Sequence, residues 1–244
     1  MRRITAIQTR RQVLGFLGGT TVISLIGCLQ RKSAADSSIQ ALAPKSSTCL
    51  VKPEQTEGPY FINERLNRAD IRSDPLDGSI RQGVPLRLVF QVSQIRDKSC
   101  LPLSGAIVDV WHCDAEGIYS DVIDRSFNTV GKKFLRGYQV TDGNGTAEFI
   151  TIYPGQYPGR AIHIHFKIRA ISAFQQGQEF TSQLYFDDVL SDRVHAQAPY
   201  RKEEQRTLNR EDGIFQRGGE QLTLQLTQAA EGYVGRFNIA LEQS

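Results

Sequence analysis

The chain has 244 residues, of which 40% are hydrophobic and 23% charged, and these values are typical of a globular protein with one substantial core. The formal net charge of +3 comes from the first 27 residues, which contain four arginines and no acidic residue, so the remainder carries a charge of −1. This near-neutral balance argues against the broad basic surface that nucleic-acid binding needs, and we expect no nucleic-acid partner.

The N-terminus has the features of a bacterial export signal. Residues 9–14 (TRRQVL) resemble the twin-arginine pattern, and an apolar stretch runs from Val13 to Gly27. This stretch is too short and too rich in glycine and threonine to span a membrane. Leu25–Cys28 resembles a lipobox, in which the cysteine is acylated and becomes the mature N-terminus. We therefore expect an exported, periplasmic or extracytoplasmic protein that meets the membrane only through a lipid on Cys28; a signal peptide cleaved nearby without lipidation is the alternative.

The sequence divides into three parts. Residues 1–27 form the expected signal peptide, residues 28–48 a flexible tether rich in serine and alanine, and residues 49–244 the folded domain. If Cys28 is lipidated, Cys49, Cys100 and Cys113 are left in an oxidising compartment, which predicts one disulfide and one unpaired thiol. Spacing alone does not choose the pair.

Short strands dominate the folded part. Several runs alternate polar and apolar residues or are rich in β-branched and aromatic residues, and Gly, Pro and Asp separate them. The turn Thr141–Gly145 predicts a hairpin leading into the next strand. Residues 191–210 are polar and irregular, which indicates a loop with a short helix over the sheets. The pattern predicts a mainly β protein, an antiparallel β-sandwich with long decorating loops. Its expected strands are Pro85–Val92, Gly105–Trp111, Thr146–Ile152, Ala161–Ile168, Gln183–Phe186, Leu222–Thr227 and Tyr233–Ile239.

One strand carries a His-x-His pair, His163 and His165. Alternate side chains of a strand share a face, so both imidazoles point one way and the neighbouring apolar residues point into the core. Such a pair can chelate one metal ion, although two hydrogen-bonded strand histidines would give the same pattern. A cupin would add a glutamate a few residues later, where Phe166–Arg169 stand instead. The other two histidines complete no familiar zinc spacing, so further ligands must be of another type.

Tyrosine is the candidate for the missing ligands. Tyr157 lies in a loop that Pro154, Gly155, Pro158 and Gly159 make rigid, and the loop feeds directly into the histidine strand. Tyr119 follows a strand and a glycine-marked turn. Either tyrosine alone would be interpreted as an amphipathic residue at the edge of the core.

Five segments, in this order along the chain, resemble the intradiol ring-cleavage dioxygenases: catechol, hydroxyquinol and protocatechuate 3,4-dioxygenases and their secreted relatives. The chain is most similar to the compact protocatechuate type, since it has no room for the long N-terminal helical domain of the catechol-cleaving branch. The segments are Pro53–Phe61, Val110–Ser120, Pro154–Arg160, His163–Phe166 and Gln183–Phe186.

The resemblance implies a non-haem Fe(3+) centre. Tyr119 and His163 would be equatorial ligands, and Tyr157 and His165 axial ones. Phenolate is a hard anionic donor that suits ferric iron, and two phenolates with one hydroxide would neutralise its charge within a partly apolar site. A free Cys113 thiol near such an iron would be vulnerable to oxidation, which favours this cysteine as a disulfide partner.

The resemblance also implies the reaction and its further residues. A catechol-type aromatic and O2 would be the substrates, and the opened ring a cis,cis-muconate-type diacid. Tyr157 would act in catalysis as well by accepting a substrate proton. Arg160 and Gln183 would be catalytic and substrate-binding, and Thr56, Pro59 and Tyr60 would close the substrate cavity. Family precedent favours association into homo-oligomers.

Two alternatives are weighed against this enzyme. The first is a lipid-anchored β-sandwich module that binds aromatics or glycans without turnover. The second is a structural copper or zinc protein that uses only His163 and His165, in which both tyrosines are replaceable without loss of metal.

Overall fold

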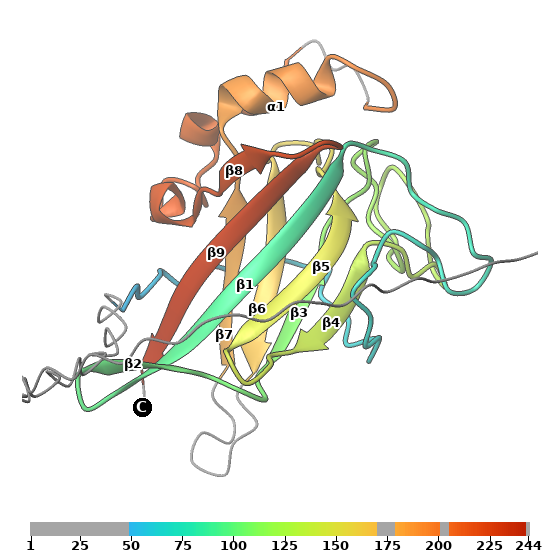
Figure 1. Cartoon of the computed structure of the whole chain (residues 1–244). Helices are drawn as coiled ribbons and strands as arrows, with labels where there is room; N and C mark the ends of the chain where they lie inside the picture. Colours follow the sequence, from blue (N-terminus) through green and yellow to red (C-terminus); the bar gives the residue numbers. More distant parts are fainter. Residues whose placement is uncertain (1–48, 170–178, 201–204, 243–244) are drawn as a thin grey trace, which may run out of the picture. The chain divides into compact units, whose positions relative to one another are not determined.

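The computed structural model describes residues 49–169, 179–200 and 205–242; the signal peptide, Cys28 and the tether that we predict for residues 1–48 lie outside these residues. The described strands form two sheets that pack face to face (Figure 1). One sheet has the order β2-β1-β9-β8, with β5 also paired to β1, and the other has the order β4-β3-β6-β7. The strands are β1 (Pro85–Arg96), β2 (Ser99–Pro102), β3 (Ile107–Trp111), β4 (Arg136–Val140), β5 (Thr146–Ile152), β6 (His163–Arg169), β7 (Glu179–Tyr185), β8 (Gln225–Gln228) and β9 (Tyr233–Glu242).

Antiparallel pairing dominates both sheets, and the mainly β sandwich is confirmed. The second sheet is antiparallel throughout, whereas β1 and β9 in the first sheet run parallel to each other. Apolar side chains from the inner faces of β1, β3, β5, β6 and β9 fill the space between the sheets. On β6 these are Ile164, Phe166 and Ile168, each fully buried. Burial of such side chains is the main favourable contribution to the free energy of folding.

The predicted strands match the observed ones in part. The strand Thr146–Ile152 has the predicted bounds, and β1 and β9 are longer than predicted. The prediction for Leu222–Thr227 is wrong in its first half, because Gly219–Leu222 form a 3-10 helix and β8 starts only at Gln225.

The hairpin predicted at Thr141–Gly145 is also wrong. The turn itself forms, with Asp142 Oδ1 accepting hydrogen bonds from Asn144 N and Thr146 N. However, β4 before the turn pairs with β3, and β5 after it pairs with β1 in the other sheet. The turn therefore crosses the edge of the sandwich, because turn residues determine where the chain reverses but not which strands pair.

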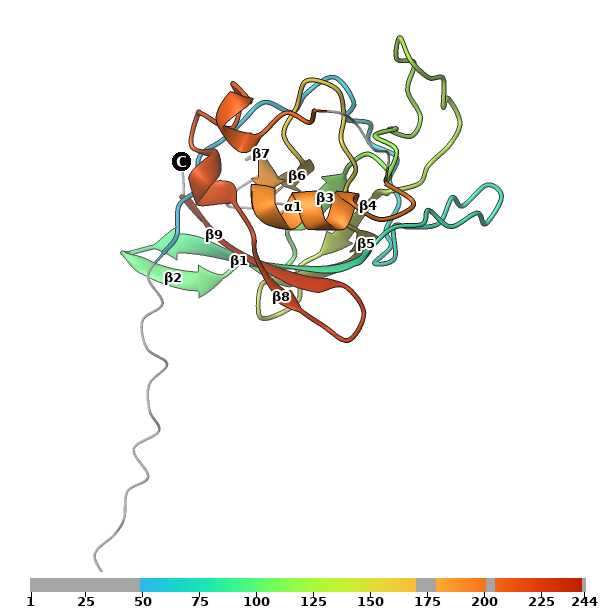
Figure 2. The same cartoon turned by 90° about the horizontal axis from the view of Figure 1, so that it is seen from above.

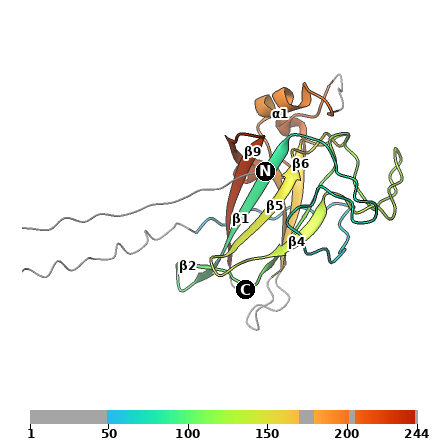
Figure 3. The ribbon, with the colours of Figure 1, turned by 45° about the vertical axis from the view of Figure 1, so that its right-hand side comes forward.

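A helix lies across one end of the two sheets (Figures 2 and 3). Helix α1 (Asp188–His195) begins after Asp187, whose side chain accepts a hydrogen bond from Leu190 N as an N-cap. The rest of the region predicted to be irregular contains a short 3-10 helix, Asn209–Glu211. Within the described ranges, no helix has the length and apolar character to cross a membrane.

The disulfide joins Cys49 to Cys100, with 5.5 Å between their Cα atoms. The prediction that Cys113 is a disulfide partner is therefore wrong. Cys113 is a buried free thiol whose Sγ lies 3.3 Å from Gly155 O. Burial raises the pKa of this thiol far above its ordinary value, so the reactive thiolate is scarce and the thiol needs no partner to survive near a metal.

Candidate metal centre and active site

Strand β6 places two imidazoles side by side on the outer face of its sheet. The Nε2 atoms of His163 and His165 are 3.0 Å apart, and the two side chains are buried. Because strand residues alternate, the same seven residues bury Ile164 and Phe166 in the core on the opposite face. The shared face expected from the His-x-His pattern is thus what the fold produces.

The hydrogen bonds of His163 identify its tautomer. Its Nδ1 lies 2.7 Å from Ala161 O, and a carbonyl oxygen only accepts, so Nδ1 carries the proton and Nε2 presents a lone pair to the cluster. Burial, assisted by the charge of Arg160, lowers the pKa of His163 to about 3. Burial and the neighbouring His163 likewise hold the pKa of His165 well below its ordinary value. Both rings are therefore neutral at neutral pH, which is the form that binds metals.

Tyr119 brings an oxygen to this pair. Its hydroxyl lies 3.1 Å from His163 Nε2, and its side chain is buried. The preceding turn is held by Asp114, whose Oδ1 accepts hydrogen bonds from Glu116 N and Ile118 N. Burial raises the pKa of Tyr119 well above its ordinary value, so without a cation the phenol stays protonated.

Gly117 lets the two tyrosine loops pack against each other. It has a φ of 82°, and a Cβ at this position would overlap the carbonyl oxygen of Gln156, next to Tyr157. Gly131 has a similar φ of 88° but open space where a Cβ would stand. It therefore provides a control for the effect of φ alone.

We expect Gly117→Ala to cost about 3 kcal/mol or more of unfolding free energy, because the positive φ alone costs about 1–2 kcal/mol and a backbone clash is added. Gly131→Ala should cost only the part that comes from the positive φ, about 1–2 kcal/mol. Chemical denaturation of both variants measures the difference. Equal losses would contradict the close packing of the loops.

Tyr157 lies in the same cluster, but its hydroxyl contacts other partners. Its ring centroid is 5.6 Å from that of Tyr119. The hydroxyl lies 2.7 Å from Tyr60 Oη and 2.9 Å from Asp124 Oδ2, and Asp124 also accepts a hydrogen bond of 2.5 Å from Tyr60. Burial raises the pKa of Tyr157. Three of the predicted ligands, His163, His165 and Tyr119, thus converge, and the ring of the fourth, Tyr157, lies alongside.

A row of side chains crosses the sheet through His165. The strand register places Arg136 opposite Trp111, Trp111 opposite His165, and His165 opposite Gln183. The indole of Trp111 stacks on the His165 ring with centroids 5.0 Å apart and planes within 9°. Arg136 donates 2.6 Å hydrogen bonds to Ser120 O and Tyr60 O. The row therefore fixes the orientation of His165 and the backbone next to Tyr119.

Arg160 and Gln183, predicted as catalytic and substrate-binding, lie beside the histidines. The Nη2 of Arg160 donates a 2.6 Å hydrogen bond to Gln183 Oε1, and its Nη1 is 3.5 Å from His163 Nε2. Gln183 Nε2 in turn donates to Thr56 O at 2.9 Å. A fixed cation thus stands at the edge of the cluster.

The predicted cavity-closing residues differ in what they contact. Tyr60 is in the cluster, and Thr56 contributes its backbone oxygen to Gln183. Pro59 is exposed. Sequence reasoning gave no role to Trp111 and missed Asp124, Arg136 and Asp212, whose Oδ2 accepts a 2.9 Å hydrogen bond from Arg160 Nε.

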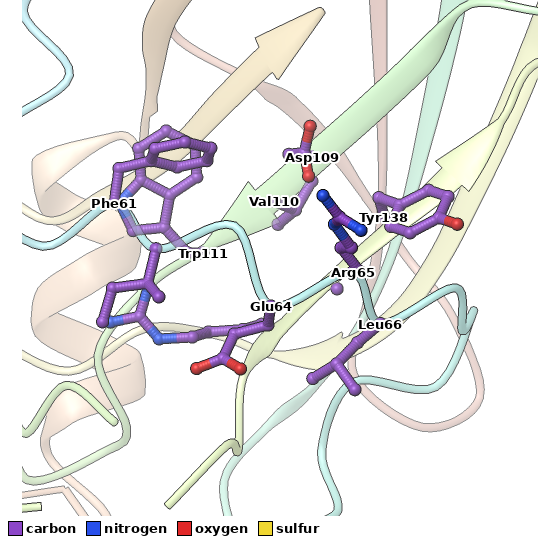
Figure 4. Close-up of a pocket in the computed structure, with 11 residues that line it drawn as sticks. Phe61, Glu64, Arg65, Leu66, Asp109, Val110, Trp111 and Tyr138 are labelled. Carbon is purple, nitrogen blue, oxygen red and sulfur yellow. The ribbon is translucent and has the colours of Figure 1, made fainter. Parts of the chain in front are cut away.

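Two cavities near these residues differ in what they can hold. One, of about 10 Å³, lies under Phe61 and Trp111 beside Glu64 (Figure 4). It has room for at most one water molecule. The other, of about 230 Å³, is lined by Tyr157 and Asp124 together with Phe127 and Arg125. Only the second is large enough for an aromatic ring.

The donors in the cluster fit a hard, highly charged metal ion. In the described part of the chain, no three histidine, cysteine, aspartate or glutamate side chains gather in a group that could hold a metal. Tyr119 offers an oxygen to a metal at His163 and His165, with its hydroxyl 3.1 Å from His163 Nε2. His165 Nδ1 is buried without a partner among the described residues. Free tyrosine has a pKa of about 10, but a coordinated trivalent cation would deprotonate it.

The sequence model of the Dioxygenase family matches residues 56–208, more than half of the chain. The fold is similar to that of an intradiol ring-cleavage dioxygenase from Tetranychus urticae, with a TM-score of 0.68 and 33% identity over 80% of this chain and 96% of that one. This chain belongs to the intradiol ring-cleavage dioxygenase family. The blocks that carried the resemblance, from Pro53 to Phe186, are the segments that meet around His163 and His165.

Further members of the family are similar over shorter or less identical stretches. The dioxygenase domain of a dioxygenase carbohydrate-binding protein fusion from Streptomyces sp. SirexAA-E has 28% identity and a TM-score of 0.57, over 80% of this chain and 99% of that one. The protocatechuate 3,4-dioxygenase beta chain of Burkholderia cepacia is 29% identical over 52% of this chain and 56% of its own length. A catechol 1,2-dioxygenase of Candida albicans is 36% identical over 41% of this chain and 31% of its own length. The matched stretches thus span about half or less of these curated relatives.

Proposed function

We propose that the chain is an Fe(3+)-dependent intradiol dioxygenase that cleaves the ring of a catechol-type aromatic with O2 to a cis,cis-muconate-type diacid. The supporting observation is that His163 Nε2 lies 3.1 Å from the Tyr119 hydroxyl and 3.0 Å from His165 Nε2, with the Tyr157 ring alongside. Both oxygen atoms of O2 enter the product, so the reaction needs no external reductant. Tyr119, Tyr157, His163 and His165 are the proposed ligands.

The residues around the ligands have distinct tasks. Bound ferric iron would draw electron density from a chelated catecholate and make its ring reactive toward O2. As a proposed ligand Tyr157 would be a phenolate, so its Oη would accept a substrate proton, and Tyr60 and Asp124, 2.7 and 2.9 Å away, would then hold the neutral phenol. Arg160 stabilises the negative charge that develops on the ring, because its guanidinium is fixed at the edge of the site. The cavity of about 230 Å³, whose lining includes Tyr157 but neither histidine nor Arg160, would receive substituents of the ring.

Oxygen consumption with a panel of catechols tests this proposal. The iron-loaded protein should consume one O2 per catechol and release a diacid heavier by one O2 molecule, as measured with an oxygen electrode and mass spectrometry. If catechols bind but no oxygen is consumed, the binding-module alternative replaces the enzyme. If zinc or copper binds equally well after both tyrosines are changed to phenylalanine, the structural-metal alternative replaces the enzyme.

We also propose that the protein is exported and anchored by a lipid on Cys28. The lipobox-like Leu25–Cys28 supports this, as does the Cys49–Cys100 disulfide, which is typical of proteins outside the reducing cytoplasm. In a bacterial host that processes lipoproteins, the full chain should sediment with membranes. Cys28→Ala should move most of it to the soluble fraction, whereas Ser33→Ala should not. An unchanged distribution for Cys28→Ala would contradict the anchor.

A further inference from the structure

A buried carboxylate approaches the site from the C-terminal part of the chain. Asp212 is 2% exposed, and both of its oxygens are engaged. Its Oδ2 accepts hydrogen bonds from Arg160 Nε and Ala161 N, each 2.9 Å long. Its Oδ1 accepts from Ile214 N at 2.7 Å and Phe215 N at 3.3 Å. The carboxylate thus links the turn that starts at Asp212 to the residues that lead into the histidine strand.

These contacts determine which nitrogen of Arg160 faces the histidines. The guanidinium is planar and rigid, so two fixed hydrogen bonds fix the direction of the remaining N–H groups. Nε is bound to Asp212 and Nη2 to Gln183 Oε1, which leaves Nη1 3.5 Å from His163 Nε2. If the hydrogen bond to Gln183 were its only one, the guanidinium could rotate about that contact.

Charge gives a second reason for a carboxylate at this place. A guanidinium next to a highly charged metal ion would be repelled from it, and a buried anion behind the guanidinium opposes this repulsion. Although burial alone would raise it, the hydrogen bond from Ala161 and the charge of Arg160 hold the pKa of Asp212 below its ordinary value. The carboxylate is therefore ionised at neutral pH. Asp212 lies beyond residues 56–208, the stretch matched by the family's sequence model.

We propose that Asp212 is a positioning residue for ring cleavage, holding Arg160 so that its Nη1 faces the reacting ring. This inference rests on the proposed function. Asp212 touches neither the proposed ligands nor the cavity beside Tyr157; it acts through Arg160.

Asp212→Asn tests the proposal, because an amide that keeps Oδ1 on Ile214 N turns an NH2 group toward the Arg160 donor. In the iron-loaded enzyme, kcat should fall about 10- to 100-fold, with unchanged iron content. The matched control is Asp109→Asn, which changes another buried carboxylate of this domain, paired through Oδ2 with Arg169 at 2.7 and 3.0 Å. It should lose as much thermal stability as Asp212→Asn and keep its kcat.

A double-mutant cycle separates positioning from a general structural role. The variant with both Asp212→Asn and Arg160→Met should be no slower than Arg160→Met alone. If the losses in kcat of the two single variants multiply in the double variant, the proposal is overturned. A wild-type kcat in Asp212→Asn would also overturn it. If Asp212→Asn does not fold, Arg160→Lys tests the same link, since one ammonium cannot occupy both hydrogen-bonding positions. A wild-type kcat in Arg160→Lys would also overturn it.

A measurement on the metal-free protein distinguishes failure of this inference from failure of the proposed function. The Arg160 Nε–H should give a resolved, slowly exchanging NMR signal in the wild type and in Asp109→Asn, and a fast-exchanging one in Asp212→Asn. An enzyme inactive with every catechol would contradict the proposed function, and the exchange rates would still decide whether Asp212 holds Arg160. Equal protection in all three proteins would overturn the inference.

Discussion

His163→Ala is expected to abolish ring cleavage and to weaken iron binding by more than 100-fold. Changing a residue that merely supports a metal ligand commonly weakens binding about 10- to 100-fold, and His163 is a proposed ligand. Its Nε2 lone pair points to the cluster because Nδ1 is bound to Ala161 O at 2.7 Å. Competition with a chelator measures the affinity, and oxygen uptake measures the activity.

The control is His195→Ala. His195 is also packed, stacked on Tyr200 with ring centroids 4.8 Å apart, and its Nε2 lies 3.0 Å from Pro154 O. It lies in α1, and its hydrogen-bond and ring contacts among the described residues are with Pro154, Tyr153 and Tyr200 and with none of the proposed ligands, so its loss should lower the melting temperature but leave iron affinity unchanged. A His163→Ala protein that binds iron like the wild type would contradict the assignment of this ligand.

Arg160→Met should lower kcat by about 10²- to 10³-fold, the cost of removing one fixed group that stabilises charge in a transition state. Methionine keeps much of the length of the side chain and removes the charge near His163. Iron content should not change, because Arg160 is not a proposed ligand. Steady-state oxygen uptake and metal analysis of the same preparation check both statements.

Arg169→Met provides the comparison, because Arg169 ends β6, the strand that follows Arg160, and pairs with Asp109 at 2.7 Å. This variant should keep the wild-type kcat. If both arginine variants lose the same activity, the effect is one of strand stability, and the proposed role of Arg160 in catalysis is wrong.

Local patterns predicted the parts of the fold that depend on neighbouring residues. Alternation placed His163 and His165 on one face and Ile164 and Phe166 on the other, as the structure has them. The strands β2 and β4 were missed because each is short and lacks a clear alternation; β4 contains Gly137, and β2 ends at Pro102. The pairing of β5 with β1 depends on contacts far apart in the sequence, which no turn motif contains.

Only the site residues that lie within the family motifs could be predicted from the sequence. Asp212 contacts Arg160 across 52 residues, and no local pattern distinguishes it from a surface aspartate. Asp124 and Arg136 likewise have partners distant in sequence. The position of the Tyr157 hydroxyl, bound to Tyr60 and Asp124, depends on this packing and not on spacing.

The cysteine prediction failed for a physical reason. It assumed that a free Cys113 thiol would be exposed to oxidation, whereas burial raises its pKa and shields it. Sequence reasoning cannot see this burial. The actual pair lies at the edge of the sandwich, where β2 brings Cys100 to the start of the described chain at Cys49.

The visible absorption spectrum of the iron-loaded protein tests the central claim most directly, because charge transfer from phenolate to ferric iron absorbs visible light. We expect one ferric ion per chain and a coloured protein, with the band altered in both Tyr119→Phe and Tyr157→Phe. Tyr153→Phe, which changes another buried tyrosine bound to Ser191 at 2.7 Å, should leave it unchanged. A colourless ferric protein, or a band that survives intact in both ligand variants, would show that these tyrosines do not hold the metal.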